Sequence, residues 1–385
     1  MELIGSMKVE LFRETTIFMQ SNKKIGVGII GLSANGGWAA RAHVPALQSL
    51  PEYEIRALTA STPQSAKAAA EKFGVPHYFT DPVELAALPE VDLVVVSVKV
   101  PEHKYLVEAA INAGKMVYCE WPLGNGLAEA QGLEALAREK EVPAFVGLQS
   151  HGVPVVRWVK DLVASRYVGE VLSTTVVGSG IIAGATVDNR GLYLLDPANG
   201  ATMLSIPFGH SIDAMCWALG EFRELSAITA NQRPQVTNTD TGAQVAKLAD
   251  DNISISGILE SGAVATIHYR GGASKATNFR WEINGTEGDL VVLGDSGHLQ
   301  FGQVTLYGAK GDDKALAELT LPAEYVAAPG SPTDISYPIT QMYQGVLSDL
   351  RDGTQLVPTF ADAVKRHQML EAIEQSAKSG TRQSY

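Results

Sequence analysis

Short runs of apolar, often β-branched residues alternate with longer alanine-rich segments from Lys24 to about residue 150. This alternation is typical of a parallel sheet whose strands are joined by crossover helices. The run 91–98 is apolar nearly throughout, as expected for a strand that is covered on both faces. The pattern predicts strands at 25–31, 54–60, 77–79, 91–98, 116–120 and 143–148, and helices at 65–73, 102–113 and 127–140.

The pattern changes after residue 148, where β-like runs follow one another without helices between them. Two of these runs, 253–259 and 263–269, flank Ser261 and Gly262, a pair that indicates a hairpin turn. A second hairpin is indicated where one run leads through a glycine-bounded turn to the next. Its two strands are predicted at 279–284 and 289–293, and helices are predicted at 154–165, 201–219, 335–352 and 362–378.

These patterns predict an α/β protein with two domains. Residues 23–150 are expected to form a Rossmann-type, doubly wound parallel sheet of six strands. Residues 151–385 are expected to form an α+β domain with a large, mostly antiparallel open sheet, whose C-terminal helix is a candidate to pack back on the first domain. Residues 1–22 are interpreted as an N-terminal extension. Because an open sheet face needs a partner surface, a homodimer or homotetramer is expected.

Composition and charge narrow the class of protein. Hydrophobic residues make up 45% and charged residues 19% of the chain, as in a globular protein. Thirty basic against 42 acidic residues give a formal charge of −12, and no Lys/Arg cluster offers a surface for phosphates, so direct nucleic-acid binding is not expected. No apolar run is long enough to predict a membrane span. Cys119 and Cys216 lie too far apart for a CxxC pair, so a reducing compartment, the cytoplasm, is expected.

A glycine-rich turn follows the first predicted strand, with the sequence Gly31-Leu32-Ser33-Ala34-Asn35-Gly36-Gly37-Trp38. Such a turn lets the backbone approach a pyrophosphate, whose charge is stabilised by amide groups at the start of the next helix. The spacing is loose, because a strict GxGxxG would place a glycine where Ser33 stands. The turn predicts a dinucleotide-binding site formed by Gly31, Leu32, Ser33, Asn35, Gly36 and Trp38.

The end of the second predicted strand bears on the choice of cofactor. NAD-preferring sites carry an acidic residue there for the adenosine ribose, whereas this chain has Thr59-Ala60-Ser61-Thr62. Without that carboxylate a 2′-phosphate is not repelled, and Ser61 and Thr62 are candidates to hydrogen-bond it. NADP is therefore slightly favoured over NAD. The alternative is that these residues simply cap the helix that begins near Pro63.

Several further segments resemble the Gfo/Idh/MocA oxidoreductase family. They are Pro101-Glu102-His103 after the fourth strand, the segment 113–122 that ends in Glu120-Trp121-Pro122, and Gly209-His210-Ser211-Ile212-Asp213. The resemblance implies a Rossmann domain followed by a sheet domain, and the use of NAD(P) to oxidise or reduce a sugar or polyol carbon. It also implies that Val98, His103 and Glu120 lie near the cofactor. Within the family, the chain is most similar to the branch that contains the galactose-pathway transcriptional repressor of yeast.

The chain departs from the family pattern at two catalytic positions. Most members read Glu-Lys-Pro where this chain has Glu120-Trp121-Pro122, and the Asp that precedes the family's His by four residues is here Ile206. An indole cannot accept or relay a proton. Trp121 either stacks on the substrate or the nicotinamide, or fills the space of the lysine and leaves a binding-only site.

Two residues remain as candidates for proton transfer. His210 is the first, since an imidazole with an ordinary pKa of about 6.5 suits reversible acid–base work. Its alternative is a structural histidine. Tyr193, with Asp196 nearby in sequence, is the second candidate, and its alternative is an ordinary loop aromatic.

Other polar residues are candidate substrate contacts. Gln149 and His151 follow the sixth strand, where open α/β sheets bind ligands. Asp213 is the acid that usually follows the family's His, and it is a candidate substrate contact or a structural partner on the same helix. No metal is expected, because the histidines and carboxylates near the predicted cleft lack ligand spacing.

Together these residues favour a cytoplasmic NAD(P)-dependent oxidoreductase that acts on a small carbohydrate or polyol without the usual family lysine. The alternative from another class is a non-catalytic dinucleotide-binding regulator that acts through a protein partner, like the yeast repressor. A third possibility is an inactive sugar-binding relative.

Overall fold

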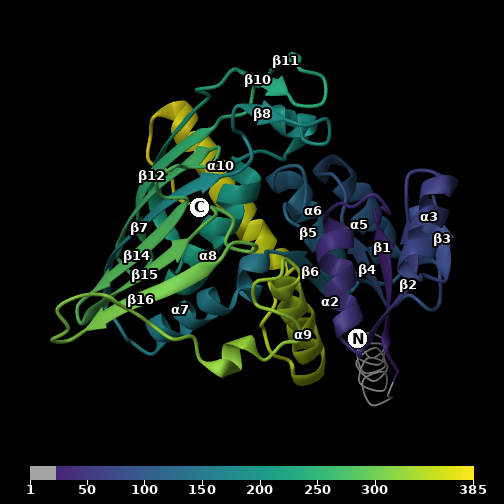
Figure 1. Cartoon of the computed structure of the whole chain (residues 1–385), viewed down its shortest axis with the longest axis horizontal. Coiled ribbons are helices and arrows are strands. Elements are labelled where there is room, and N and C mark those ends of the chain that lie inside the picture. Colours follow the sequence, from purple (N-terminus) through teal and green to yellow (C-terminus); the bar gives the residue numbers. More distant parts are fainter. Residues whose placement is uncertain (1–22) are drawn as a thin grey trace, which may run out of the picture.

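The computed structural model describes residues 23–385, so the predicted N-terminal extension, residues 1–22, lies outside the described residues. The first part of the described chain forms a parallel sheet of six strands in the order β3-β2-β1-β4-β5-β6 (Figure 1). This confirms the predicted doubly wound sheet, whose strand order reverses between β1 and β4. The strands are β1 (Ile25–Ile30), β2 (Tyr53–Thr59), β3 (His77–Phe79), β4 (Leu93–Val96), β5 (Met116–Glu120) and β6 (Ala144–Gly147).

Helices connect these strands, as a parallel sheet requires. Thr62 caps α3 ahead of Pro63, and Asp81 caps α4 ahead of Pro82. The α-helices are α2 (Val44–Ser49), α3 (Pro63–Phe73), α4 (Pro82–Ala86), α5 (His103–Asn112) and α6 (Leu127–Glu139), and the shorter turns are η1 (Ala39–His43), η2 (Val100–Glu102) and η3 (Gln149–Gly152).

The second part of the chain is built on an eight-stranded sheet in the order β17-β16-β15-β14-β7-β13-β12-β9. Neighbouring strands are antiparallel except β7 and β13, which pair in parallel, so the predicted mostly antiparallel sheet is confirmed. A smaller sheet has the order β11-β10-β8. The strands are β7 (Val171–Gly180), β8 (Thr186–Val187), β9 (Phe222–Ala230), β10 (Gln235–Asn238), β11 (Gln244–Ala246), β12 (Asn252–Leu259), β13 (Val264–Gly271), β14 (Phe279–Gly285), β15 (Gly288–Gly294), β16 (Val304–Lys310) and β17 (Ala317–Glu318).

Figure 1 shows α8 and α10 between this large sheet and the first domain. Helix α10 contacts β9 of the large sheet and also α6 and β6 of the first domain, so one helix joins both parts. The helices of this part are α7 (Pro154–Ala164), α8 (Gly209–Leu219), α9 (Tyr337–Asp352) and α10 (Phe360–Ser379), with the turns η4 (Leu192–Leu195), η5 (Pro197–Asn199), η6 (Leu204–Phe208) and η7 (Ala323–Val326).

Some apolar side chains of the large sheet are exposed. Leu172, Ile228 and Val264 on β7, β9 and β13 are each more than half exposed. A homodimer or homotetramer that covers such a face stays a prediction. Among the helices of residues 23–385, none combines the length and the apolar character that a membrane span needs.

The helix predicted at 201–219 differs from the structure in its first part. A π-helical turn, η6, precedes α8, and the N–H of Phe208 donates to the carbonyl of Met203 at 3.1 Å. Pro207 lies inside this turn and has no N–H to donate, so a regular α-helical ladder cannot continue through it. The α-helix therefore begins at Gly209, and His210 stands in its first turn.

Candidate active site

The glycine turn lies at the carboxyl end of β1, against the end of β4. Gly31, Gly36 and Gly37 all have φ values near +100°, a region that favours glycine. A Cβ added at Gly31 would lie 2.5 Å from Cγ1 of Val98, whereas one added at Gly36 or Gly37 would meet no atom within 4 Å. Ser33 closes the turn, because its carbonyl accepts from the N–H of Gly36 at 3.3 Å. This open backbone cradle ahead of a helical segment fits the pyrophosphate of a dinucleotide.

Other residues of the turn connect it to the core and to the second domain. Leu32 is fully buried beneath the turn. Asn35 is exposed, and its backbone carbonyl accepts a hydrogen bond from the guanidinium of Arg190 at 3.5 Å. The Trp38 ring lies 6.2 Å from the ring of Phe301. Its buried Nε1 has no hydrogen-bond partner among residues 23–385. Two separate segments of the second domain therefore reach the glycine turn.

The end of β2 carries no carboxylate, as the sequence shows, and its two candidate residues have different surroundings. The hydroxyl of Thr62 accepts from the N–H of Ser65 at 3.1 Å, and the Ser65 hydroxyl accepts from the N–H of Thr62 at 3.1 Å. Thr62 is thus the cap of α3, as the capping alternative predicts. Ser61 is exposed and remains available to a ligand.

The His103 ring lies between the loops that follow β4 and β5 and within hydrogen-bond distance of both. It is almost fully buried, with Nδ1 2.8 Å from the carbonyl of Pro122 and Nε2 3.2 Å from the carbonyl of Val98. Burial lowers the pKa of His103, so the ring is neutral and donates only one of these two bonds. His103 therefore fixes the backbone behind Val98, on the cofactor edge of the sheet.

Glu120 and Gln149 belong to one buried polar network. Nε2 of Gln149 donates to Glu120 at 2.6 Å, and the other carboxylate oxygen lies 2.9 Å from Nε2 of His43. His43 in turn lies 2.7 Å from the hydroxyl of Tyr343 on α9. This network ties β5 and the end of β6 to η1 and α9. The cofactor candidate Glu120 and the substrate candidate Gln149 are thus both oriented by hydrogen bonds within the protein.

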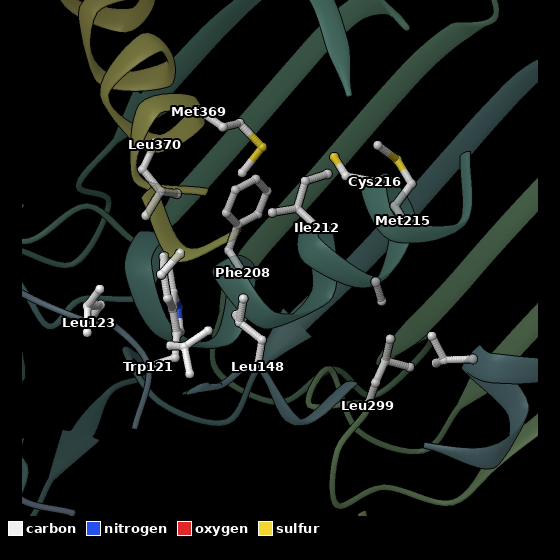
Figure 2. Packing of buried hydrophobic residues seen from close by; sticks show 14 of the residues in the cluster. Trp121, Leu123, Leu148, Phe208, Ile212, Met215, Cys216, Leu299, Met369 and Leu370 are labelled. Carbon is white, nitrogen blue, oxygen red and sulfur yellow. The ribbon is translucent and has the colours of Figure 1, made fainter. Parts of the chain in front are cut away.

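Trp121 is buried, with 4% of its surface exposed. Its indole N–H donates to the carbonyl of Ser205 at 2.6 Å. Figure 2 shows the ring in hydrophobic packing that also contains Leu148, Phe208 and Leu370. A Cβ added at Gly209 would lie 2.8 Å from its Nε1, so the indole packs directly on the start of α8. This packing favours the interpretation that Trp121 fills the lysine's space.

His210 follows Gly209 in the first turn of α8 and is 4% exposed. Its carbonyl accepts from the hydroxyl of Ser150 at 3.0 Å. Its Nδ1 is buried and has no hydrogen-bond partner within the described part of the chain. Burial, and to a lesser degree His298, lower the pKa of His210 to about 3, although Asp213 acts in the opposite direction. At neutral pH the imidazole is therefore neutral and holds one N–H and one lone pair.

Asp213 lies in a buried polar network with His151 and with Arg366 of α10. Oδ2 of Asp213 lies 2.9 Å from Nε2 of His151, and Oδ1 accepts from Nε of Arg366 at 3.1 Å. Burial raises the pKa of Asp213, but His151 and Arg366 outweigh it and the pKa is lowered overall. The His151 ring stacks on Trp217 at 4.0 Å. Asp213 is thus committed to structural partners.

His151 also lines a separate cavity. This cavity of about 360 Å³ lies beside α9, and Arg157, Gln341 and Arg351 contribute to its walls. The glycine turn and His210 are not among its lining residues. The candidate active site is therefore defined by the glycine turn and the start of α8 and not by this cavity.

Tyr193 lies in η4, and Nζ of Lys99, which directly precedes η2, lies 4.8 Å from the centre of its ring. Burial raises the pKa of Tyr193. Asp196 does not assist the phenol, since its carboxylate accepts from the N–H of Ala198 at 2.9 Å and caps η5. The structure thus places Tyr193 beside the first domain with a lysine as its neighbour.

The sequence interpretation missed His298, which the structure brings close to His210 and the glycine turn. The ring of His298 stacks on Phe301 at 4.6 Å, and Phe301 in turn contacts Trp38. No motif surrounds this histidine, so no local signal could have identified it. Among residues 23–385, no group of three metal-ligating side chains is gathered in a metal-binding arrangement.

Comparison with known proteins agrees with this geometry. Residues 25–148 match the model of the oxidoreductase family with an NAD-binding Rossmann fold, and residues 154–294 match the model of the Gal80p C-terminal domain. The chain is 33% identical over 377 residues to dehydrogenase aclE of Aspergillus oryzae, which covers 94% of this chain and 99% of that protein. The chain belongs to the Gfo/Idh/MocA oxidoreductase family.

This family member is also similar to a regulator and to a sugar dehydrogenase. It is 29% identical to the galactose/lactose metabolism regulatory protein GAL80 of Kluyveromyces lactis, over 74% of this chain and 67% of that protein. The structure of a levoglucosan dehydrogenase in complex with NADH and levoglucosan has the same fold. Its TM-score is 0.80 at 20% identity, covering 94% of this chain and 99% of that one.

Proposed function

We propose that this Gfo/Idh/MocA protein is an NAD(P)-dependent oxidoreductase that acts on a sugar or polyol, with His210 as the proton-transferring residue. The observation that carries the proposal is the buried, neutral imidazole of His210, whose Nδ1 has no partner within residues 23–385. A buried polar atom without a partner costs about 1–3 kcal/mol, a cost that a bound ligand removes. The relatives include a dehydrogenase at 33% identity and a sugar dehydrogenase of the same fold.

The glycine turn supports dinucleotide binding. Gly36 and Gly37 leave open space beside backbone amides, and Val98 and Ser61 follow β4 and β2, the two strands that flank β1. A nicotinamide dinucleotide supplies a hydride acceptor in one direction and a hydride donor in the other. Because residues 59–62 contain no carboxylate, we propose that NADP is accepted as well as NAD, with Ser61 near the 2′ position.

His210 then manages the hydroxyl proton. When an alcohol carbon gives up its hydride, the proton of its hydroxyl passes to the lone pair of the neutral imidazole, and it returns when a carbonyl is reduced. Negative charge that develops on the substrate oxygen favours the imidazolium, because an opposite charge nearby raises the pKa of a histidine. Trp121 packs on Gly209 and Ser150 holds the His210 carbonyl, so both position this ring. Tyr193, with Lys99 beside it, is a second polar group at the same edge.

The test is turnover of the purified full chain. NAD and NADP are each offered with a series of sugars and polyols, in both directions, and absorbance of the reduced nicotinamide is followed. A thermal-shift titration of both cofactors runs in parallel. The proposal expects turnover with at least one neutral sugar or polyol. Cofactor-dependent stabilisation without turnover on any of them contradicts it.

A second candidate function is a dinucleotide-dependent regulator that acts through a protein partner. Trp121 favours it, because a buried indole stands where most of the family carries a lysine. The similarity to GAL80 of K. lactis points in the same direction. This candidate expects cofactor binding without turnover, and an affinity for a protein partner that changes when the dinucleotide is added.

A further inference from the structure

The loop 295–303 joins β15 to β16 and lies beside His210. The carbonyl of Gly297 accepts two hydrogen bonds at 2.9 Å, one from the hydroxyl of Ser211 and one from the hydroxyl of Tyr269. Ser211 directly follows His210 on α8, and His298 directly follows Gly297. Leu299 of the same loop lies in the buried cluster of Figure 2. The loop is therefore fixed to the start of the catalytic helix.

The same loop reaches the glycine turn of the first domain. His298 stacks on Phe301 with ring centres 4.6 Å apart, and Phe301 lies 6.2 Å from Trp38. A continuous series of rings thus leads from the neighbourhood of His210 to the cofactor edge of the sheet. A substrate that contacts both His210 and a bound dinucleotide would lie along this loop.

Polar atoms without protein partners are concentrated here. Both ring nitrogens of His298 and Oε1 of Gln300 are buried and find no hydrogen-bond partner in residues 23–385, and the same holds for Nδ1 of His210 and Nε1 of Trp38. His298 and Gln300 are 4% and 3% exposed. An unpartnered buried polar atom is destabilising, and buried polar groups elsewhere in proteins are almost always paired. Hydroxyl groups of a ligand would supply the hydrogen-bond partners that these atoms lack.

The loop supplies neutral groups. Burial lowers the pKa of His298 to about 4, so the ring is uncharged at neutral pH, and the amide of Gln300 is always neutral. A neutral imidazole and an amide each offer both donors and acceptors. Hydroxyl groups also donate and accept at one atom, so they can satisfy both. A carboxylate only accepts and gains no opposite charge from this loop.

We propose that loop 295–303 is the substrate-recognition loop of this enzyme, and that His298 and Gln300 hydrogen-bond hydroxyl groups of an uncharged, polyhydroxylated substrate. The inference rests on the proposed function, because it names the substrate class of that site. It makes His298 a specificity-determining residue beside His210.

The test compares three variants of His298 and Gln300 with the wild-type full chain. His298→Phe keeps a ring to stack on Phe301 but removes both nitrogens, His298→Gln restores a donor and an acceptor, and Gln300→Leu removes the amide. The matched control is His268→Phe, because His268 is an exposed histidine on β13. Circular dichroism and thermal melting identify any variant that fails to fold.

Two readouts are taken with cofactor present. Turnover is measured on glucose, xylose, sorbitol and inositol and on the acids gluconate and glucuronate, and binding of the same compounds is measured by calorimetry. We expect the neutral compounds to be preferred. His298→Phe should raise KM or Kd for the preferred compound roughly 5- to 150-fold. His298→Gln should recover part of the loss, Gln300→Leu should show a smaller rise, and cofactor affinity and His268→Phe should be unchanged.

The outcomes separate the two proposals. If the wild type binds a neutral compound but does not turn it over, the proposed oxidoreductase fails while His298→Phe still tests the recognition loop by calorimetry. If folded His298→Phe binds and turns over the neutral compounds as the wild type does, the loop inference is overturned. It is also overturned if the acids are preferred, or if the wild type neither binds nor converts any neutral compound.

Discussion

The glycine turn and the start of α8 serve the same candidate site in different ways. The turn acts through its backbone, since Gly31, Gly36 and Gly37 hold positive φ values and two of them border open space. The start of α8 depends on one side chain, His210, and on the packing of Trp121 behind it. The proposed dinucleotide binding therefore needs few particular side chains, whereas the proposed proton transfer needs a specific one. If the proposed function holds, the replacements at Trp121 and Ile206 are expected to affect turnover and not the cofactor cradle.

The largest expected effect is on turnover when the α8 side is changed. His210→Asn keeps a polar side chain of similar size but removes the proton acceptor. We expect kcat to fall by about 10²- to 10⁴-fold, the usual contribution of a general acid–base residue. Dissociation constants for NAD and NADP, measured by fluorescence titration, should be unchanged. If the variant keeps more than about a tenth of the wild-type rate, His210 is not the proton-transferring residue. The control is His268→Asn, because His268 is an exposed residue of β13.

The converse change is made in the glycine turn. Gly37 has φ +105°, and a Cβ there would enter the open space beside the turn. In Gly37→Val the left-handed backbone is strained by about 1–2 kcal/mol and the added methyl groups obstruct the cradle. We expect dinucleotide affinity to fall at least tenfold, with turnover at saturating cofactor little affected.

Gly262 offers a matched control for that experiment. It has φ +93° with no atom within 4 Å of an added Cβ, but it stands in the turn between β12 and β13. Gly262→Val should therefore lower the free energy of unfolding by a similar amount and leave cofactor affinity unchanged. Equal cofactor affinity in the two variants would show that the turn does not bind the dinucleotide.

A smaller effect is expected at Trp121, and it decides between the two interpretations of that residue. Trp121→Phe removes the N–H that donates to the Ser205 carbonyl and leaves that acceptor without this partner. We expect the free energy of unfolding, measured with urea, to fall by about 1–3 kcal/mol, with turnover reduced less than in His210→Asn. A raised substrate KM with unchanged stability would instead show that the indole stacks on a ligand.

The same contrast between local and distant determinants explains what the sequence could predict about the fold. The six-stranded sheet was predictable because its β-rich runs alternate with helical segments, and the clearest of them, β4, is apolar and buried along its whole length. The sequence interpretation did not single out β7, although it is central in the large sheet. Its segment Val171–Gly180 mixes serine, threonine and glycine with valine, and only pairing with β13 and β14 makes it a strand.

The residues of the candidate site show the same contrast between local and distant determinants. The glycine turn is contiguous in sequence, so its residues could be identified together. The position of His298 depends on its neighbour Gly297, whose carbonyl accepts hydrogen bonds from Ser211 and Tyr269. These donors lie 86 and 28 positions from Gly297 in the sequence, so no local pattern encodes where His298 lies. Capping by Thr62 is local and was one of the two alternatives that the sequence offered, whereas the ion pair of Asp213 with Arg366 joins residues 153 positions apart and is not given by the sequence alone.

The last expected effect is a pH dependence of stability at the α8 side, to which the glycine turn itself contributes nothing because residues 31–38 contain no titratable side chain. Burial lowers the pKa of His298 to about 4 and that of His210 to about 3. Below about pH 6.5, the ordinary pKa of histidine, these two imidazoles bind protons in the unfolded chain but stay neutral in the folded protein. The free energy of unfolding is therefore highest above that pH and decreases as the pH falls toward 4 and 3. Each such histidine adds a slope of about 1.4 kcal/mol per pH unit in this window. Urea unfolding of the wild type and His298→Gln at pH 7, 6 and 5 should show a shallower loss in the variant, and parallel losses would mean that His298 is not held neutral in the folded protein.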